Sequence, residues 1–389
     1  MSDLKIFAKD VEQEALDQIN LFLAQKPFED CKIRIMPDVH AGKGCVIGFT
    51  ANLSNRVIPN IVGVDIGCGM LTVPLGNVKI DYKQLDSVIR RKIPSGMAVQ
   101  KMYSECDLIG RLRCFSELRN VDRLHASLGT LGGGNHFIEI DESKDGEKYL
   151  IIHSGSRNLG KQVAEIYQNI AIENHYSVKQ DIQELIEQYK AEGREREISE
   201  AIEEIKKCKT KLPKDLCYLE GYDAQCYLKD MQLCTLFASS NRLKMAKTII
   251  YELGLHPKER DFQTVHNYIG HDNIVRKGAI SAALGENVLI PMNMRDGCIL
   301  GVGKGNVDWN CSAPHGAGRI MSRSKAKSTI PLEEYRESMN GIFTTSVCDG
   351  TLDEAPQAYK PMADIVEAIK DTVRITKIIK PTYNFKASE

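Results

Sequence analysis

Two residues of types that commonly bind metal ions, Asp65 and Cys68, lie three positions apart in a glycine-rich turn. The apolar residues from 61 to 64 lead into this turn and predict a strand there. Gly67 stands between the two side chains and lets both turn toward one ion. Because a thiolate can also bridge two ions, the pair points to Mn²⁺, Fe²⁺, Co²⁺ or Zn²⁺ rather than Mg²⁺.

Three histidines stand in similar settings elsewhere in the chain. His136 closes a run of glycines, His153 ends an apolar segment before a Ser-Gly turn, and His266 precedes Asn267. A single histidine or cysteine is more often a packed or hydrogen-bonded residue than a ligand, and the spacing matches no recognised zinc pattern. The hypothesis of a metal centre therefore depends on all five residues together, each where a rigid element meets a loop.

His315 is set apart from these residues in the segment Ala313 to Gly318. Arg319 and Arg323 follow it, four positions apart, so on a helix they would share one face. If residues 316–318 lead into that helix, its positive end and two guanidinium groups would surround the imidazole. Such a setting favours attack of a neutral imidazole nitrogen on phosphorus. The alternative, in which His315 is only a structural residue of a turn, has equal weight.

Three glycine-rich segments offer backbone N–H groups that could bind phosphate: residues 129–135, 153–160 and 301–306. None contains a P-loop or a clear dinucleotide-binding fingerprint, and glycine turns between strands are more often structural. Arg157 adds a cation to the second segment, which makes it a candidate for binding phosphate or RNA.

Short elements on both sides of a helical middle predict an α+β fold. The flanks predict strands within residues 31–75, 136–140, 149–153 and 265–318, a helix at 81–92, a final helix at 362–373 and a tail at 378–386. Helical spacing and charge dominate residues 160–253, where Glu192 to Arg194 suits the bend of a helical hairpin. Because candidate residues lie on both sides of this stretch, we expect one domain, 1–389, with a helical insertion at 160–253.

The bulk properties exclude several classes of protein. A content of 42% hydrophobic and 26% charged residues is that of a globular protein, and a net charge of −1 gives no overall field for nucleic acid. None of the 12 cysteines forms a C-x-x-C pair, which argues against a zinc ribbon. No export signal or membrane-spanning run is evident, so we expect a cytoplasmic monomer that does not bind membranes.

Six segments, taken together and in this order, resemble the RtcB family of RNA ligases over nearly the whole chain. They are Met36-Pro37-Asp38-Val39-His40, Val62 to Met70, Gly132 to Phe137, His153-Ser154-Gly155-Ser156-Arg157, His266-Asn267 and Ser312 to Arg319. The resemblance implies mixed or antiparallel sheets around a central active-site cleft. It also implies an enzyme that uses GTP and two Mn²⁺ ions to join RNA 2′,3′-cyclic phosphate or 3′-phosphate ends to 5′-hydroxyl ends, in RNA repair or tRNA splicing.

The same resemblance assigns roles to single residues. Cys68 would bridge both ions, with Asp65 and His136 completing one site and His153 and His266 the other. His315 would attack the α-phosphorus of GTP and carry GMP to the RNA 3′-phosphate. Nucleotide contacts would come from Asn135, His136, Phe137, Glu139, His266, Asn267, Pro291, Cys298, His315, Ala317, Gly318, Tyr359 and Lys386. Tyr359 would stack on guanine and Lys386 would read it, with Lys380 as a second candidate. Phosphate or RNA contacts would come from Arg157, Arg319 and Arg323.

The sequence departs from the family pattern at one nucleotide-binding loop. Where the family has Pro-Gly-Ser-Met-Gly-Thr, this chain has Pro291-Met292-Asn293-Met294-Arg295-Asp296-Gly297, which leaves a strict preference for GTP open. Two other functions stay open as well. One is a metal-dependent RNA cyclic phosphodiesterase or phosphatase, and the other is a non-catalytic RNA-binding protein that retains a metal site.

Overall fold

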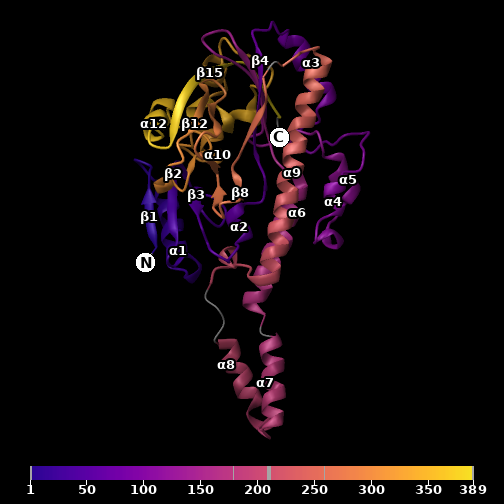
Figure 1. The fold of residues 1–389 in the computed structure, drawn as a ribbon, viewed down its shortest axis with the longest axis vertical. Coiled ribbons are helices and arrows are strands. Elements are labelled where there is room, and N and C mark those ends of the chain that lie inside the picture. The colour runs from indigo at the N-terminus through magenta and orange to yellow at the C-terminus, as the bar shows by residue number, and fades with distance from the viewer. Residues whose placement is uncertain (1, 178, 208–211, 258, 388–389) are drawn as a thin grey trace.

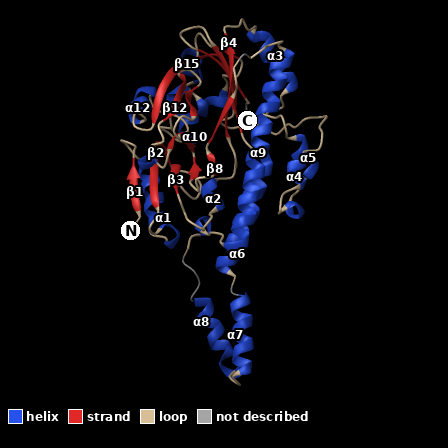
Figure 2. Cartoon of the chain, viewed as in Figure 1, coloured by secondary structure: helices blue, strands red, loops and turns tan. Residues whose placement is uncertain are grey.

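The α+β prediction is confirmed by the computed structural model, which describes residues 2–177, 179–207, 212–257 and 259–387. Figure 1 shows the sheets and their short helices on one side of the body and a long helix, α9, along the other. Figure 2 shows that strands are confined to the body, from which a pair of helices projects. The structure thus separates a mixed body, which holds the candidate residues, from a helical extension.

An eight-stranded sheet holds most of the candidate residues. Its strands lie in the order β11-β12-β15-β5-β6-β4-β7, with β14 paired to β15. Their bounds are β4 Gly69–Gly76, β5 Phe137–Glu142, β6 Lys148–Ser154, β7 Phe262–Val265, β11 Asn287–Asn293, β12 Gly297–Gly303, β14 Phe343–Thr344 and β15 Val373–Lys386. All pairs are antiparallel except β14 with β15. Residues at the same end of β4, β5 and β6 are therefore neighbours in space.

A five-stranded sheet and a two-stranded sheet complete the β structure. The first has the order β1-β2-β3-β9-β8, in which only β1 and β2 are parallel, and the second pairs β10 with β13. The bounds are β1 Asp3–Ile6, β2 Lys32–His40, β3 Ile47–Ala51, β8 Asn267–Ile269, β9 Val275–Lys277, β10 Ala279–Ser281 and β13 Ser312–Pro314. The predicted mixed and antiparallel sheets are thus confirmed.

The helical middle comprises α6 Arg157–Tyr176, α7 Lys179–Ala191, α8 Ile198–Lys207 and α9 Gly221–Glu252. Helices α7 and α8 pack on each other as the predicted hairpin and extend away from the body (Figure 1). Helices α6 and α9 instead contribute buried residues to the main hydrophobic core, so they belong to the body. The limits of an insertion at 160–253 stay a prediction, and residues 178 and 208–211 of that stretch lie outside the described residues.

Shorter helices surround the sheets. They are α1 Gln13–Leu23, α2 Pro59–Val62, α3 Tyr82–Lys92, α4 Asp107–Gly110, α5 Val121–Ala126, α10 Arg323–Thr329, α11 Leu332–Ser338 and α12 Met362–Ala368. Short 3₁₀ segments occur at Lys26–Phe28, Phe115–Glu117, Glu195–Glu197, Lys214–Leu216, Val307–Trp309, Asp349–Glu354 and Pro356–Ala358. Helix α3 begins where predicted, because the Asp81 side chain accepts hydrogen bonds from two backbone N–H groups of its first turn.

Two sequence predictions of local structure are wrong. Residues 61 and 62 end the short helix α2 instead of forming a strand, because Pro59 starts a helical turn and Gly63, with φ of 99°, ends it. The predicted helix at 362–373 ends at Ala368, and the supposed tail is β15, which pairs with both β12 and β5. Hydrogen bonds to a strand on each side pair the backbone N–H and C=O groups of β15. The residue types in this segment do not indicate that pairing.

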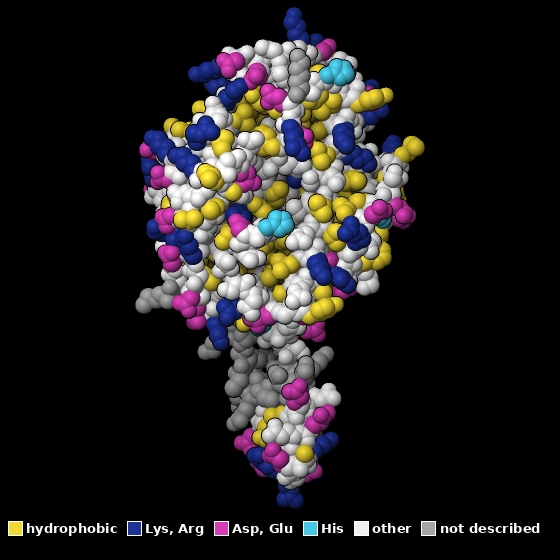
Figure 3. Space-filling view, in the orientation of Figure 1, with side chains coloured by type: hydrophobic (Ala, Val, Ile, Leu, Met, Phe, Trp, Pro, Cys, Tyr) yellow, Lys and Arg dark blue, Asp and Glu magenta, His cyan; other side chains and the backbone are white. Residues whose placement is uncertain are grey.

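Within the described ranges, no helix combines the length and the apolar character that crossing a bilayer requires. On the face shown in Figure 3, basic and acidic side chains are interspersed over the body, which agrees with the net charge of −1. A binding surface for an anion must therefore be a local feature.

Candidate active site

Cys68, His136 and His153 bring their ligand atoms together at one end of three neighbouring strands. Cys68 precedes β4, His136 precedes β5 and His153 lies near the end of β6. The Cys68 Sγ lies 3.4 Å from His136 Nε2 and 3.3 Å from His153 Nε2. All three side chains are buried, which is the setting of a rigid and water-excluded ligand group.

Asp65 joins this group through His136. Asp65 Oδ2 lies 3.1 Å from His136 Nε2, and the backbone N–H of Ser156 donates to Asp65 Oδ1 at 3.0 Å. Burial opposes ionisation of Asp65, but the hydrogen bond from His136 and the charges of His136 and Arg157 hold its pKa below the ordinary value. The carboxylate is therefore charged at neutral pH and offers oxygen ligands beside the thiol.

Backbone carbonyls set the orientation of two imidazole rings. His136 Nδ1 lies 2.9 Å from the Leu131 carbonyl, and His153 Nδ1 lies 3.1 Å from the Asn135 carbonyl. In this arrangement Nδ1–H of each ring donates to its carbonyl. His153 Nε2 presents its lone pair toward Cys68, whereas His136 Nε2 is the atom that donates to Asp65. The glycine-rich loop at 129–135 thus orients metal-ligand candidates.

His266 continues the group toward the nucleophile candidate. The ring centroid of His266 lies 5.2 Å from that of His153 and 4.8 Å from that of His315. Its Nδ1 is buried and has no hydrogen-bond partner. Burial lowers the pKa of both His153 and His266 well below the ordinary value, so both rings are neutral and retain lone pairs. His266 is not among the three residues whose ligand atoms lie together, but its unpaired buried nitrogen next to the His153 ring fits a divalent metal with mixed N, S and O ligands.

His315 follows β13 and is held by a residue of β2. Asp38 Oδ2 lies 2.7 Å from His315 Nδ1 and accepts a hydrogen bond from the His315 backbone N–H at 3.2 Å. The Asp38 side chain is fully buried, whereas that of His315 is 17% exposed. Asp38 therefore accepts from Nδ1–H and leaves Nε2 of His315 with the lone pair, as a nucleophilic imidazole requires.

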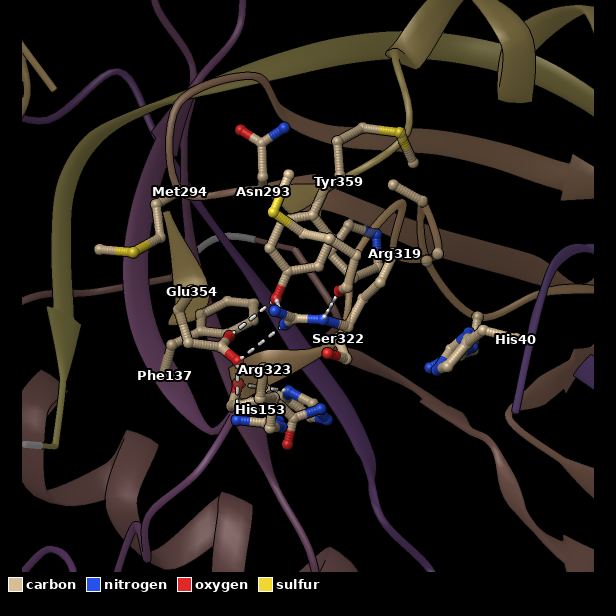
Figure 4. A pocket seen from close by; sticks show the side chains of 18 of the residues that line it. His40, Phe137, His153, Asn293, Met294, Arg319, Ser322, Arg323, Glu354 and Tyr359 are labelled. Atoms are coloured by element: carbon tan, nitrogen blue, oxygen red, sulfur yellow. Dashed lines mark hydrogen bonds and ion pairs between the residues drawn. The ribbon is translucent and has the colours of Figure 1, made fainter. Parts of the chain in front are cut away.

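A cavity of about 540 Å³ opens beside His315. This volume lies in the range of small-ligand sites. Figure 4 shows Phe137 beside Glu354 and His153 below both in this cavity, with Tyr359 above them and His40 at a distance to one side. Of the predicted site residues, the cavity is lined by Asn135, Phe137, Glu139, His153, Pro291, His315, Ala317, Gly318, Arg319, Arg323, Tyr359 and Lys386.

Arg319 and Arg323 do not share a helical face, because α10 begins only at Arg323. Ser322 caps this helix, and Arg319 lies in extended backbone that pairs with Tyr359. The two guanidinium groups nevertheless meet at Glu354, where Arg319 Nη1 lies 3.3 Å and Arg323 Nη1 3.0 Å from Oε1. The expected helix N-terminus behind His315 is thus wrong, and a shared carboxylate brings the arginines together instead.

Glu354 also contacts two further residues that were predicted to bind the nucleotide. Tyr359 donates its hydroxyl to Glu354 Oε2 at 2.8 Å, and Lys386 Nζ lies 2.5 Å from the same oxygen. Burial opposes ionisation of Glu354, but Lys386 and Arg323 outweigh it and lower the pKa to about 2. Lys386 also lies over the Phe137 ring. The structure therefore places Lys386 in the cavity, whereas Lys380 does not line it.

A second buried polar group lies under the cavity floor. The ligand atoms of Glu139, Asp141 and Cys298 lie within 4.8 Å of one another, and Asn384 Nδ2 donates to Glu139. Burial raises the pKa of Asp141 to about 7 and that of Glu139 well above its ordinary value. Cys298 is fully buried and does not line the cavity.

Arg157 and Asn267 lie on the other side of the metal-ligand candidates, outside the cavity lining. Arg157 Nη1 lies 3.4 Å from His136 Nδ1, and the Asn267 amide donates to the Asp65 carbonyl at 3.3 Å. Gly132 has a φ of 87°, which favours glycine, and a Cβ there would lie 1.8 Å from Arg157 Nη1, so the Arg157 guanidinium occupies the space beside this glycine.

Sequence reasoning missed several residues that position the site. Asp38 stands in one of the segments that resemble the family, but its spacing does not link it to His315, and no sequence signal marks Glu354. Arg242 Nη1 donates to the carbonyls of Gly67 and Ser154 at 2.9 and 2.6 Å, and so ties two ligand loops to α9. An arginine in a helix carries no local signal of such a role.

The comparisons with known proteins agree with this geometry. A family model described as tRNA-splicing ligase RtcB matches residues 21–113 and 99–387. RNA-splicing ligase RtcB of Escherichia coli strain K12 is 29% identical over 410 residues, which cover 94% of this chain and 92% of the relative. tRNA-splicing ligase RtcB of Aeropyrum pernix is 26% identical, and that of Nanoarchaeum equitans is 27% identical, each over 89% of this chain and 85% of the relative. Because the family model spans most of its length, the chain belongs to the RtcB family of RNA ligases.

Proposed function

We propose that this RNA ligase joins a 2′,3′-cyclic phosphate or 3′-phosphate end to a 5′-hydroxyl end through a GMP group carried on His315. The observation that carries the proposal is the 2.7 Å contact between Asp38 and His315 Nδ1 beside a cavity of nucleotide size. A buried carboxylate that accepts from Nδ1–H keeps the lone pair on Nε2 and stabilises the ring when Nε2 forms a bond.

Three transfers complete the reaction. In the first, His315 Nε2 attacks the α-phosphorus of GTP, an N–P bond forms, and pyrophosphate leaves. In the second, an oxygen of the RNA 3′-phosphate attacks the same phosphorus, and the N–P bond breaks to release His315. In the third, the 5′-hydroxyl loses its proton and attacks the RNA phosphorus, and GMP leaves with the bonding electrons. A cyclic end first takes up water to give the 3′-phosphate.

Asp65, Cys68, His136, His153 and His266 would hold two Mn²⁺ ions, with Cys68 shared between them. Such ions neutralise phosphoryl oxygens and orient them for in-line attack. Burial raises the pKa of the Cys68 thiol well above its ordinary value, and a coordinated cation would favour the thiolate. Arg319, Arg323 and Lys386, which line the cavity, would face the nucleotide, and Tyr359 would contact the base.

The test is covalent labelling of the protein by GTP. The purified chain is incubated with α-labelled GTP and Mn²⁺ and separated under denaturing conditions. We expect an acid-labile, hydroxylamine-sensitive label that His315→Ala abolishes and that the exposed control His271→Ala retains. Hydrolysis of a cyclic phosphate without any labelled adduct would instead establish the phosphodiesterase alternative, and RNA binding with neither activity would establish the non-catalytic one.

A further inference from the structure

One long face of α9 carries basic and exposed apolar side chains away from the active-site cavity. Its residues recur every three or four positions, as a single helical face requires: Lys229, Leu233, Leu236, Ser240, Lys244, Lys247 and Tyr251. From Lys229 to Tyr251 this face is about 33 Å long at 1.5 Å per residue. Several basic side chains lie over α9 on the right of the face shown in Figure 3.

A groove of about 720 Å³ lies along the C-terminal half of this face. Lys92, Lys244 and Lys247 line it, and Glu252 is its single acidic residue among the described lining residues. Glu252 already pairs with Lys92 at 3.0 Å. Tyr251 is 84% exposed at the edge of the groove. The groove therefore has an excess of positive charge beside an aromatic ring that can stack on a base.

A second groove, of about 640 Å³, lies along the N-terminal half of the same face. Arg111, Arg113 and Lys229 line it, and no acidic side chain does so among the described residues. Leu236, which is 53% exposed, lies on the α9 side of this groove. The two grooves extend the positive charge along most of the helix, although the whole chain has a net charge of −1.

The segment at residues 96–100 connects the first groove to the metal-ligand candidates. Gln100 lines the groove and donates to the Gly129 carbonyl at 2.8 Å. The Gly96 backbone N–H donates to the Gly132 carbonyl at 2.9 Å, and Arg157 Nη2 lies 3.4 Å from the Gly96 carbonyl. The groove therefore begins behind the loop that orients His136 and His153.

We propose that this face of α9 binds the sugar–phosphate backbone of the RNA beyond the ends that are joined. The inference rests on the proposed function, which requires RNA at the metal-ligand candidates, and it adds the path of the strand outside the cavity. Lysine and arginine attract phosphates whatever the base sequence, so this surface would supply affinity without sequence preference. Tyr251 would add stacking with an unpaired base.

The test compares a long RNA with a short one on charge-reversed protein. In Lys244→Glu/Lys247→Glu, the dissociation constant for a 30-nucleotide RNA should rise roughly tenfold or more. The slope of affinity against salt concentration should fall by about two, one for each lost phosphate contact. Binding of a six-nucleotide RNA, which reaches only the cavity, should change less than about twofold.

Three controls make the result specific. Lys244→Arg/Lys247→Arg keeps the charge and should bind the long RNA like the unchanged protein. Lys26→Glu/Lys370→Glu makes the same charge change at exposed positions outside both grooves and should also leave binding unchanged. Labelling of His315 by GTP, which requires no RNA, should persist in every variant and so reports intact folding.

Two outcomes would overturn the inference. One is an unchanged affinity and salt slope for the long RNA in Lys244→Glu/Lys247→Glu. The other is an equal loss for long and short RNA, because that would indicate damage to the cavity. Failure of the proposed function has a different signature, since the unchanged protein would then form no adduct on His315 at all.

Discussion

The metal-ligand candidates form a first wall of the site, of which only His153 lines the cavity, and the group around Glu354 forms a second wall. The two walls differ in whether their polar groups are satisfied. On the metal-ligand side, His266 Nδ1 is buried without a partner, and the Cys68 thiol lies among imidazole nitrogens. In the second wall, Glu354 is paired with Arg319, Arg323 and Lys386, and it accepts a hydrogen bond from Tyr359. The first wall keeps a buried ring nitrogen without a partner, whereas each of these charged groups of the second wall has one.

Because of this difference, we expect substitutions in the two walls to affect different properties of the protein. Removing a ligand from the first wall should affect metal binding and chemistry more than folding, because these side chains offer their ligand atoms to an ion in addition to their contacts within the protein. Removing the carboxylate of the second wall should affect folding, because it leaves the buried Lys386 ammonium without its counter-charge. The predictions below separate the two walls by measuring metal content, adduct formation and stability.

The largest effect is expected for Cys68→Ser. Serine keeps the size of the side chain but supplies no thiolate, so the shared ligand of both proposed ions is lost. We expect metal content, measured by mass spectrometry on the purified protein, to fall below one ion per chain, and ligation to fall by about 10³-fold or more. Cys226→Ser on α9, away from the ligand group, is the matched control and should retain both. Full metal content in Cys68→Ser would contradict the bridging role.

The next effect is expected for Asp38→Asn. The amide keeps the shape but can no longer accept from His315 Nδ1–H as a charged group, so the wrong tautomer is favoured and the imidazolium-like product is not stabilised. The rate of nucleotide labelling of His315 should fall by roughly 10²- to 10⁴-fold. Metal content should stay at the level of the unchanged protein. A parallel loss of metal would show that Asp38 supports the first wall and not only the nucleophile.

The metal-ligand wall could be predicted from the sequence because its signals are local. Cys68, His136 and His153 each adjoin glycine turns at strand ends, and antiparallel pairing of β4, β5 and β6 brings those ends together. The role of each residue came from the family resemblance and stays a proposal. The His136 and His153 ring centroids lie 5.1 Å apart because of the register between β5 and β6. No single segment of the sequence specifies that register.

The second wall can be predicted only in part. The family resemblance points to Arg319, Arg323, Tyr359 and Lys386, but nothing in the sequence indicates the carboxylate that joins them. Glu354 lies at the end of a 3₁₀ segment, and its partner Lys386 is 32 positions away on a strand that the sequence presented as a tail. The ion pair between Glu354 and Lys386 forms only because β15 lies inside the sheet, between β12 and β5. The sequence near each residue does not indicate this position of β15.

A stability effect with a defined pH dependence is expected for Glu354→Gln. The depression of the Glu354 pKa from 4.5 to about 2 corresponds to about 3 kcal/mol of stability at neutral pH. Because the folded-state pKa is lowered, this contribution is present above pH 4.5 and is lost as the pH falls toward 2. Urea unfolding should therefore show a constant difference between the two proteins from pH 7 to about pH 5 and a smaller difference below that.

Glu333→Gln is the control for this experiment. Glu333 pairs with Arg336 on the surface, where its side chain is 76% exposed, so its loss should change stability by less than about 0.5 kcal/mol at any pH. A difference for Glu354→Gln that grows as the pH falls would contradict the sign derived above. Retained metal content in Glu354→Gln would further separate this wall from the first.

The smallest effect is expected for Arg295→Ala, in the loop that departs most from the family pattern. Arg295 pairs with Asp296, and the Asn293 side chain accepts from the backbone N–H of both residues, so the pair belongs to the turn between β11 and β12. Arg295 is 44% exposed and does not line the cavity. Its loss should change stability by less than about 1 kcal/mol and the KM for GTP in His315 labelling by less than about twofold. If labelling instead shifts from GTP to ATP, the substituted loop reads the base, and the nucleotide preference of this chain is set at Arg295 as well as at the second wall.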